Sequence, residues 1–126
     1  MPEVVAIIFS VLVAFTMVFQ LALVAGAPLG EFTLGGKWHG RLPPIGRGIA
    51  LFSTVLLLGF SVVLLARSGL AFPNLYDASR LIVWVIVGYC ALGIIANAAT
   101  PSARERRIWL PVVIVMFICS TYVALS

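Results

Sequence analysis

The stretch VVAIIFSVLVAFTMVFQLALVA, residues 4–25, decides the fold of this chain. Gln20 is its only strongly polar residue, and a helix needs about 20 apolar residues to cross a bilayer. No Lys or Arg precedes the run, which favours a retained span over a cleaved signal peptide. Similar runs follow at 49–66, 81–99 and 108–125. The sequence therefore predicts an all-α protein, a four-helix transmembrane bundle with spans at about 4–25, 47–67, 79–99 and 103–125.

The composition supports the same class. Hydrophobic residues make up 63% of the 126 residues and charged residues 10%, whereas soluble domains have about 45–50% and about 25%. A soluble domain of this size exposes a large share of its surface to water, so it could not bury this many apolar residues. We expect a single integral membrane domain over residues 1–126 with the lipid bilayer as its partner. The composition excludes a soluble protein, a disordered chain and a nucleic-acid-binding domain.

Positive charge distinguishes the two ends of the predicted bundle. The connections 26–48 and 100–107 share one side and hold six of the eight Lys and Arg residues: Lys37, Arg41, Arg47, Arg104, Arg106 and Arg107. Cytoplasmic connections are enriched in Lys and Arg. We therefore expect a long Gly/Pro-rich cytoplasmic loop between the first two spans, and both termini on the non-cytoplasmic side.

Polar residues inside the spans gather toward the cytoplasmic side. Thr16 and Gln20 lie one turn apart in the first span. Four residues share one face of the third span at i, i+4, i+8 and i+11: Tyr89, Gly93, Asn97 and Thr100. Two interpretations stay open, a pocket that opens to the cytoplasm and hydrogen bonds that hold the helices together.

Small residues in the third span favour close helix packing. Gly88 stands near Ala91, and Gly93 near Ala96. Small residues at such spacing let helix backbones approach closely in membranes. The partner could be another helix of the bundle or a second copy of the chain.

The loop 26–48 is longer than most connections between helices, and such loops are often functional. It carries Glu31, Lys37, His39 and Arg41 among several glycines. Glycine-rich backbone with Lys and Arg is suited to a phosphate or a lipid head group. The alternative is a loop at the membrane interface whose Lys and Arg residues serve only to keep this side of the protein in the cytoplasm. The sequence leaves open whether the loop is re-entrant or lies on the surface.

The connection before the fourth span has a capping signature. Ser102 and Glu105 have the spacing of a capping box, so the fourth helix should begin there. We also expect structural ion pairs that fasten the first loop to this helix start, among Glu31, Glu105, Arg104, Arg106 and Arg107.

The sequence contains no clear pattern of catalytic, ion-conducting or metal-binding residues. No ionisable residue stands in the middle of a span, although such residues mark proton and ion pathways. His39 has no partner at metal-ligand spacing, and Cys90 and Cys119 read as small buried hydrophobes. We expect no catalytic residue, no metal and no cofactor, and the sequence leans against an enzyme.

The cytoplasmic segments resemble a known group of proteins. GAPLGEFTLGG at 26–36 with LPP at 42–44, and PSARERRIWLPV at 101–112, are similar to a family of small uncharacterised bacterial four-span integral membrane proteins. The resemblance implies multi-pass insertion in the bacterial cytoplasmic (inner) membrane, and it implies no activity.

Two functions follow as hypotheses. The first is a non-enzymatic small integral membrane protein that acts by association, as a homo-oligomer or as an accessory subunit of a membrane-protein partner. The alternative is a binding or transport protein with a cytoplasm-facing polar site for a lipid head group or a small anion. Its expected ligand-binding residues are Gln20, Glu31, Lys37, His39, Arg41, Asn97, Glu105 and Trp109.

Overall fold

The computed structural model describes residues 1–33, 36–38 and 40–126, without the side chain of Glu31. The described residues form the long helices α1 (Pro2–Val24), α2 (Pro44–Ser68), α3 (Tyr76–Ala99) and α4 (Ala103–Leu125), with the short 3₁₀ helices η1 (Gly30–Phe32) and η3 (Pro73–Leu75). These four helices are long and apolar enough to cross a membrane, which confirms the predicted number of apolar helices. Length and composition thus identify a multi-pass membrane protein whose apolar surface contacts lipid.

The ends of the helices follow from local sequence. Pro44 stands in the first turn of α2, where its missing N–H costs nothing, so α2 begins three residues before the predicted span at 47. Gly69, with φ +85°, ends α2 in the left-handed conformation that glycine adopts readily. The Ser102 hydroxyl accepts a hydrogen bond from the Glu105 backbone N–H at 3.2 Å, which confirms this half of the predicted capping box.

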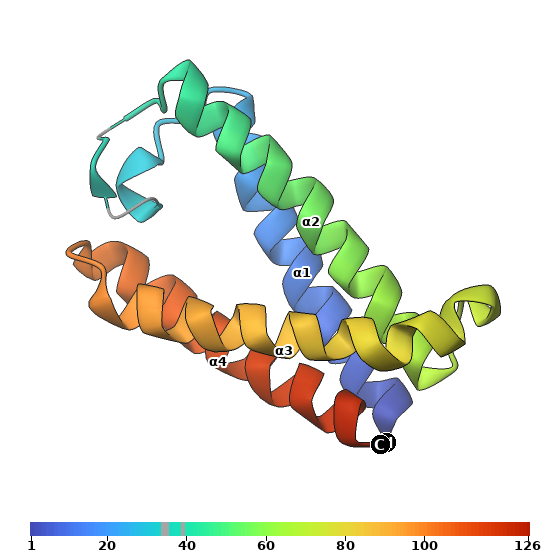
Figure 1. Ribbon diagram of the computed structural model, residues 1–126. Coiled ribbons are helices and arrows are strands. Elements are labelled where there is room, and N and C mark those ends of the chain that lie inside the picture. Colours follow the sequence, from blue (N-terminus) through green and yellow to red (C-terminus); the bar gives the residue numbers. More distant parts are fainter. Residues whose placement is uncertain (34–35, 39) are drawn as a thin grey trace.

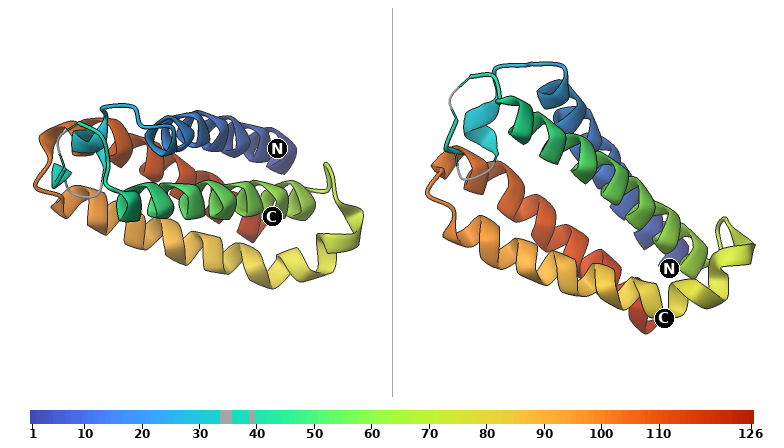
Figure 2. Two further views of the ribbon diagram at one scale, coloured as in Figure 1. Left: turned by 90° about the horizontal axis from the view of Figure 1, so that it is seen from above. Right: turned by 45° about the horizontal axis from the view of Figure 1, so that its top comes forward.

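The helices form two hairpins that diverge. Figure 1 shows α1 beside α2 and α3 beside α4. The two pairs meet near the chain termini and separate toward the end that carries η1 and the turn between α3 and α4 (Figures 1 and 2). We call these the packed end and the open end.

The main apolar core fills the packed end. Its largest fully buried side chains include Phe9 of α1, Leu64 of α2, Ile86 of α3 and Val123 of α4. These residues come from the first halves of α1 and α3 and the second halves of α2 and α4. All four helices therefore contribute to one apolar layer. The apolar contacts of this core hold the four helices together at the packed end.

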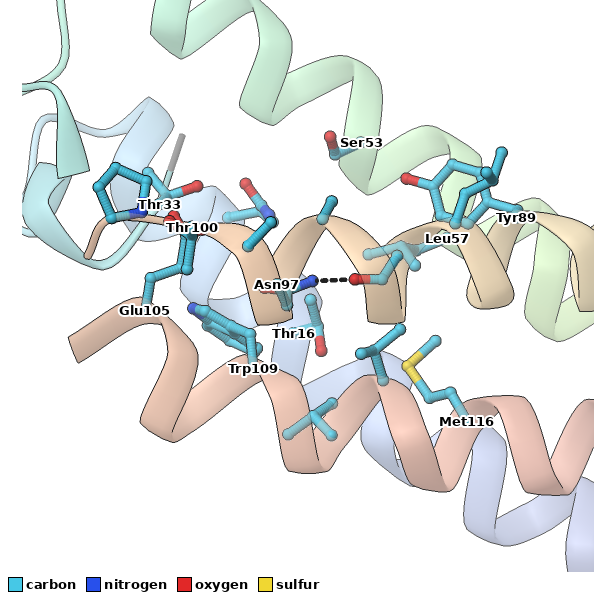
Figure 3. A pocket seen from close by; sticks show the side chains of 18 residues that line it. Thr16, Thr33, Ser53, Leu57, Tyr89, Asn97, Thr100, Glu105, Trp109 and Met116 are labelled. Carbon is cyan, nitrogen blue, oxygen red and sulfur yellow. Dashed lines mark hydrogen bonds between the residues drawn. The ribbon is translucent and has the colours of Figure 1, made fainter. Parts of the chain in front are cut away.

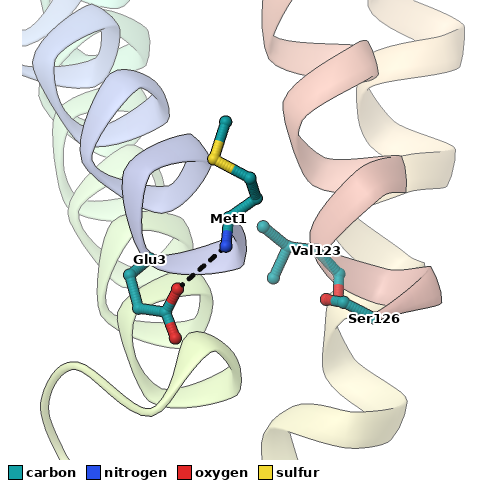
Figure 4. Close-up of polar contacts among 4 residues, drawn as sticks. All are labelled: Met1, Glu3, Val123 and Ser126. Atoms are coloured by element: carbon teal, nitrogen blue, oxygen red, sulfur yellow. Dashed lines mark hydrogen bonds and ion pairs between the residues drawn. The ribbon is translucent and has the colours of Figure 1, made fainter.

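Polar contacts at the packed end join the helices directly. The hydroxyls of Ser10 and Ser61 lie 2.7 Å apart and link α1 to α2. The Arg67 guanidinium donates to the Tyr76 hydroxyl at 3.1 Å and also to the Ser126 carbonyl oxygen. Both chain ends lie here, and the Met1 amino group contacts the Glu3 carboxylate at 3.3 Å (Figure 4).

The open end has a smaller apolar cluster that involves only the first hairpin and its connection. Leu23, Leu42 and Ala50 are buried together there. Arg47 donates from Nε and Nη2 to the Val24 carbonyl oxygen, at 2.9 and 2.6 Å, and so satisfies a carbonyl group at the end of α1. No described residue of the second hairpin belongs to this cluster, so its apolar contacts stabilise the first hairpin and its connection.

The two glycines expected to support close packing in α3 differ. A Cβ atom on Gly93 would lie 2.9 Å from Cγ2 of Val113, so α3 approaches α4 closely at this point. A Cβ atom on Gly88 would have no atom within 4 Å among the described residues. Close packing inside the chain therefore uses Gly93 and not Gly88.

Candidate functional site

A pocket of about 620 Å³ lies between the hairpins toward the open end (Figure 3). All four long helices and Thr33, which follows η1, contribute to its wall. The lining residues are Thr16, Gln20, Thr33, Ser53, Leu57, Tyr89, Leu92, Gly93, Ala96, Asn97, Ala99, Thr100, Pro101, Glu105, Trp109, Val112, Val113 and Met116. Ligand pockets typically have volumes of about 300–1,000 Å³, so this one is large enough for a small molecule.

The pocket changes character along its length. Figure 3 shows Glu105, Thr33 and Thr100 at one end and Leu57, Tyr89 and Met116 toward the other. Leu57 and Met116 also belong to the packed core. The floor of the pocket is therefore apolar, and its polar groups lie mostly near the open end.

The polar groups of α1 and α3 face the pocket without joining the helices to each other. Thr16 donates to the Leu12 carbonyl at 2.9 Å, and Asn97 donates from Nδ2 to the Gly93 carbonyl at 2.7 Å (Figure 3). Both bonds stay within one helix. This geometry favours the pocket interpretation over hydrogen bonds between helices.

Three further lining residues keep their polar groups available. Gln20, Ser53 and Tyr89 make no hydrogen bond to the described part of the chain, and the polar atoms of Gln20 and Ser53 are not fully buried. Tyr89 is held in place by its ring, which packs edge-on against Phe60 at 5.0 Å between centroids. These groups can therefore hydrogen-bond a bound molecule.

Glu105 supplies the charge of the pocket. Only 8% of its surface is exposed, and the start of α4 places it in the wall. It is the only Asp, Glu, Lys or Arg among the lining residues of the described part of the chain. The adjacent arginines bind elsewhere as well: Arg106 donates to the Thr100 carbonyl at 2.8 Å, and Arg104 lies over the Phe32 ring at 5.8 Å.

Trp109 connects three segments around the pocket. Its indole N–H donates to the Phe32 carbonyl of η1 at 2.8 Å. Its ring packs against Phe19 and Phe15 of α1, with centroids 4.8 and 5.9 Å away. One side chain of α4 therefore holds both α1 and the connection after it beside the pocket mouth.

The structure brings together four of the eight residues expected at a ligand site. Gln20, Asn97, Glu105 and Trp109 line the same pocket. Two others lie apart from it: Lys37 is exposed, over the ring of Trp38 at 5.1 Å, and the Arg41 guanidinium lies close to Gly26. His39 and the side chain of Glu31 lie outside the described residues. The expected ion pairs of Glu31 with the arginines of α4 lie outside them too, so that clamp stays a prediction.

Sequence reasoning missed the aromatic cluster and the apolar floor. Phe15 and Phe19 stand one position before Thr16 and Gln20, so the helical period that grouped the polar pair could have grouped the phenylalanines. No sequence signal pairs them with Trp109, because that contact depends on how α1 crosses α4.

The arrangement is suited to binding. It offers hydrogen-bonding groups, one carboxylate and an aromatic ring around an apolar floor. Within residues 1–33, 36–38 and 40–126, no three His, Cys, Asp or Glu side chains are grouped to hold a metal ion. Comparison of the chain with family models, curated proteins and solved structures gives no match.

Proposed function

We propose that this multi-pass membrane protein is a non-enzymatic binding or transport protein that takes a small amphipathic molecule into the pocket between its hairpins. The observation that supports this proposal most strongly is that the polar groups of α1, α2 and α3 that line the pocket make no hydrogen bonds between helices. Thr16 and Asn97 bond within their own helices, and Gln20, Ser53 and Tyr89 are available to a ligand. Polar groups used only to hold helices together would bond across the helix interface instead.

The orientation belongs to the same proposal. The six Lys and Arg residues of the two connections stand at the open end of the bundle. By the charge asymmetry of membrane proteins this end faces the cytoplasm, and both termini face the other side. Placement in a bacterial inner membrane is part of the proposal, and it depends on the predicted resemblance of residues 26–36, 42–44 and 101–112 to bacterial four-span proteins.

The binding proposal can be tested with two matched substitutions in α3. Ala96→Phe places a ring in the pocket wall, whereas Ala98→Phe places the same ring at an exposed position that does not line the pocket. Each variant is purified in lipid nanodiscs and analysed by native mass spectrometry with identification of retained small molecules. We expect a bound molecule in the wild type and in Ala98→Phe, and its loss in Ala96→Phe.

The same measurement tests the association hypothesis, which stays a prediction. A homo-oligomer or a co-purifying membrane protein, with no retained small molecule in any of the three samples, would contradict the binding proposal. It would favour a protein that acts by association.

The orientation has its own test. Lys37 is exposed, and the native Cys90 and Cys119 are buried, so a cysteine at position 37 should be the site that reacts. A membrane-impermeant maleimide should label Lys37→Cys in inside-out vesicles and not in intact cells. Arg80→Cys, at the opposite end of the bundle, should give the reverse pattern. Reversed results for the pair would show that the orientation is wrong.

A further inference from the structure

We infer that the pocket takes an uncharged single-chain lipid from the leaflet at the open end, through a side opening between α2 and α3. The inference rests on the proposed binding function and adds the chemical class of the ligand and its route. It follows from which lining residues are exposed, which polar groups are available, and how polar and apolar groups are ordered along the pocket.

The exposed residues of the pocket lie along one edge. Within the described part of the chain, every exposed lining residue belongs to α3 or to the turn after it: Tyr89, Leu92, Ala96, Ala99 and Pro101. The lining residues of α1, α2 and α4 are buried or half-buried. The pocket therefore opens along α3.

Three neighbouring helix pairs are closed beside the pocket. α1 and α2 lie side by side as one hairpin (Figure 1). Gly93 brings α3 so close to α4 that an added Cβ atom would lie 2.9 Å from Cγ2 of Val113. The ring of Trp109 packs against Phe15 and Phe19 and joins α4 to α1. The remaining pair, α2 and α3, provides the opening.

The side opening faces the lipid. α2 and α3 are in ring contact at Phe60 and Tyr89, and from there they separate toward the open end (Figure 1). Leu92, on the rim, is 69% exposed, and Phe52, next to the lining residue Ser53 on α2, is 68% exposed. Large apolar side chains this exposed on a membrane-spanning helix contact hydrocarbon, so a molecule dissolved in the bilayer can reach the pocket directly.

The side opening is about as long as one leaflet is deep. Its rim runs from Tyr89 to Ala99, ten residues apart on α3, a rise of about 15 Å. This is half of the hydrocarbon core, which is about 30 Å thick. A lipid chain in the leaflet at the open end therefore lies beside the opening over most of its length.

Polar and apolar groups follow each other in the pocket in the order found in a leaflet. Gln20 and Asn97 stand near the open end, four residues before the end of α1 and two before the end of α3. Ser53 lies farther in, and Leu57 and Met116 form the apolar floor. A lipid with its head at the membrane surface and its chain directed inward can therefore enter without turning over.

The available lining groups carry no charge. Gln20, Ser53 and Tyr89 make no hydrogen bond within the described residues, and together they offer donors and acceptors. Glu105, the only lining residue of the described part with a full charge, already interacts with other groups of the chain. A charged head with no counter-charge in the wall would lose its hydration at a high cost in free energy. The pocket therefore favours an uncharged head with hydroxyl or carbonyl groups over the anion considered from the sequence.

Three photoreactive probes with the same acyl chain test the head group: a monoacylglycerol, its 3-phosphate and the acyl ester of choline. Each carries a diazirine at the same position of the chain, and their heads are neutral, negative and positive. The protein is reconstituted in phosphatidylcholine vesicles with increasing mole fractions of one probe and irradiated, and mass spectrometry identifies the labelled residues. Val113 and Met116 report on the pocket, whereas the exposed Ile114 and Val115 do not line it and report on ordinary lipid contact.

We expect the monoacylglycerol to label Val113 and Met116 saturably. The two charged probes should need mole fractions about tenfold higher or more for half-saturation, because their heads must be desolvated. Labelling of Ile114 and Val115 should rise in proportion to the mole fraction of every probe. Half-saturation by either charged probe at or below that of the monoacylglycerol would overturn the inference without any variant.

Matched substitutions test the side opening and the head group. Leu92→Trp adds bulk to the rim, and Ile95→Trp adds the same bulk at an equally lipid-exposed site of α3 that does not line the pocket. Tyr89→Phe removes a lining hydroxyl, and Tyr122→Phe removes one from an exposed tyrosine outside the pocket. We expect Leu92→Trp to lose most of the pocket labelling. Tyr89→Phe should need about fivefold more monoacylglycerol for half-saturation, as for the loss of one neutral hydrogen bond, and both controls should match the wild type.

The outcomes separate the two proposals. If Leu92→Trp is labelled like Ile95→Trp, or Tyr89→Phe like the wild type, the inference fails while pocket binding stands. The inference also fails if no probe labels the pocket saturably although a small molecule is retained in nanodiscs. If neither saturable labelling nor a retained molecule is found, the binding function itself fails.

Discussion

Replacing Trp109 by phenylalanine should free the connection between α1 and α2 from α4 and leave the helices in place. The substitution removes the indole N–H that donates to the Phe32 carbonyl at 2.8 Å. A phenyl ring still fits between Phe15 and Phe19, so most of the aromatic contact with α1 is kept. The loss is therefore one hydrogen bond between segments far apart in the sequence.

The magnitude follows from the energy of that bond. A hydrogen bond of this kind contributes about 1 kcal/mol net, and 1 kcal/mol changes a local opening equilibrium about fivefold. The backbone N–H groups of Phe32 and Thr33 report on this opening, because they donate to the carbonyls of Leu29 and Gly30 at 3.0 and 3.3 Å.

Hydrogen–deuterium exchange measured by mass spectrometry provides the assay. Peptides covering residues 26–33 should exchange about fivefold faster in Trp109→Phe than in the wild type, while peptides within α1 and α4 keep their rates. Trp84→Phe is the matched control, because Trp84 is 46% exposed and makes no hydrogen bond to the described residues. Equal protection of residues 26–33 in both variants would refute the view that Trp109 fastens this connection.

Two further predictions concern the contacts between helices. Gly93→Ala places a methyl group 2.9 Å from Val113 and should lower the free energy of unfolding by about 1–3 kcal/mol, whereas Gly88→Ala, with open space around it, should be neutral or stabilising by up to about 1 kcal/mol. Thermal unfolding in detergent compares the pair, and an equal effect of both substitutions would contradict the close approach of α3 to α4. In a double-mutant cycle of Ser10→Ala and Ser61→Ala, the 2.7 Å contact should give a coupling energy of about 0.6 kcal/mol, the average for such bonds in membranes. Additive effects would show that the two hydroxyls do not bond to each other.

The four helices could be predicted because each apolar run is close to the length of about 20 residues that a bilayer crossing requires. The polar face of α3 was predictable too, since Tyr89, Gly93 and Asn97 repeat at the helical period and all line the pocket. Glu105 and Trp109 were identified from their place near the start of the fourth helix, and the structure sets them in the same wall.

The angle between the hairpins could not be predicted. The helical period says which residues share a face, and it says nothing about which helix that face meets. The contact of Trp109 with Phe32 joins residues 77 positions apart. Gly88 illustrates the same limit, because spacing alone suggested a packing role that no contact within the described residues supports.

The divergence of the hairpins also affects the cross-sectional area that the protein occupies in each leaflet of the membrane. A bundle that is narrow at one end and broad at the other occupies unequal areas in the two leaflets. A molecule that draws the hairpins together or forces them apart at the open end would change mainly the area that the protein occupies in the leaflet at that end. By the reciprocity of coupled equilibria, lateral pressure in that leaflet must change the affinity for the molecule by the same factor. Under the proposed binding function, the surrounding lipid is a second ligand of the open end, and a change in membrane curvature should change occupancy of the pocket.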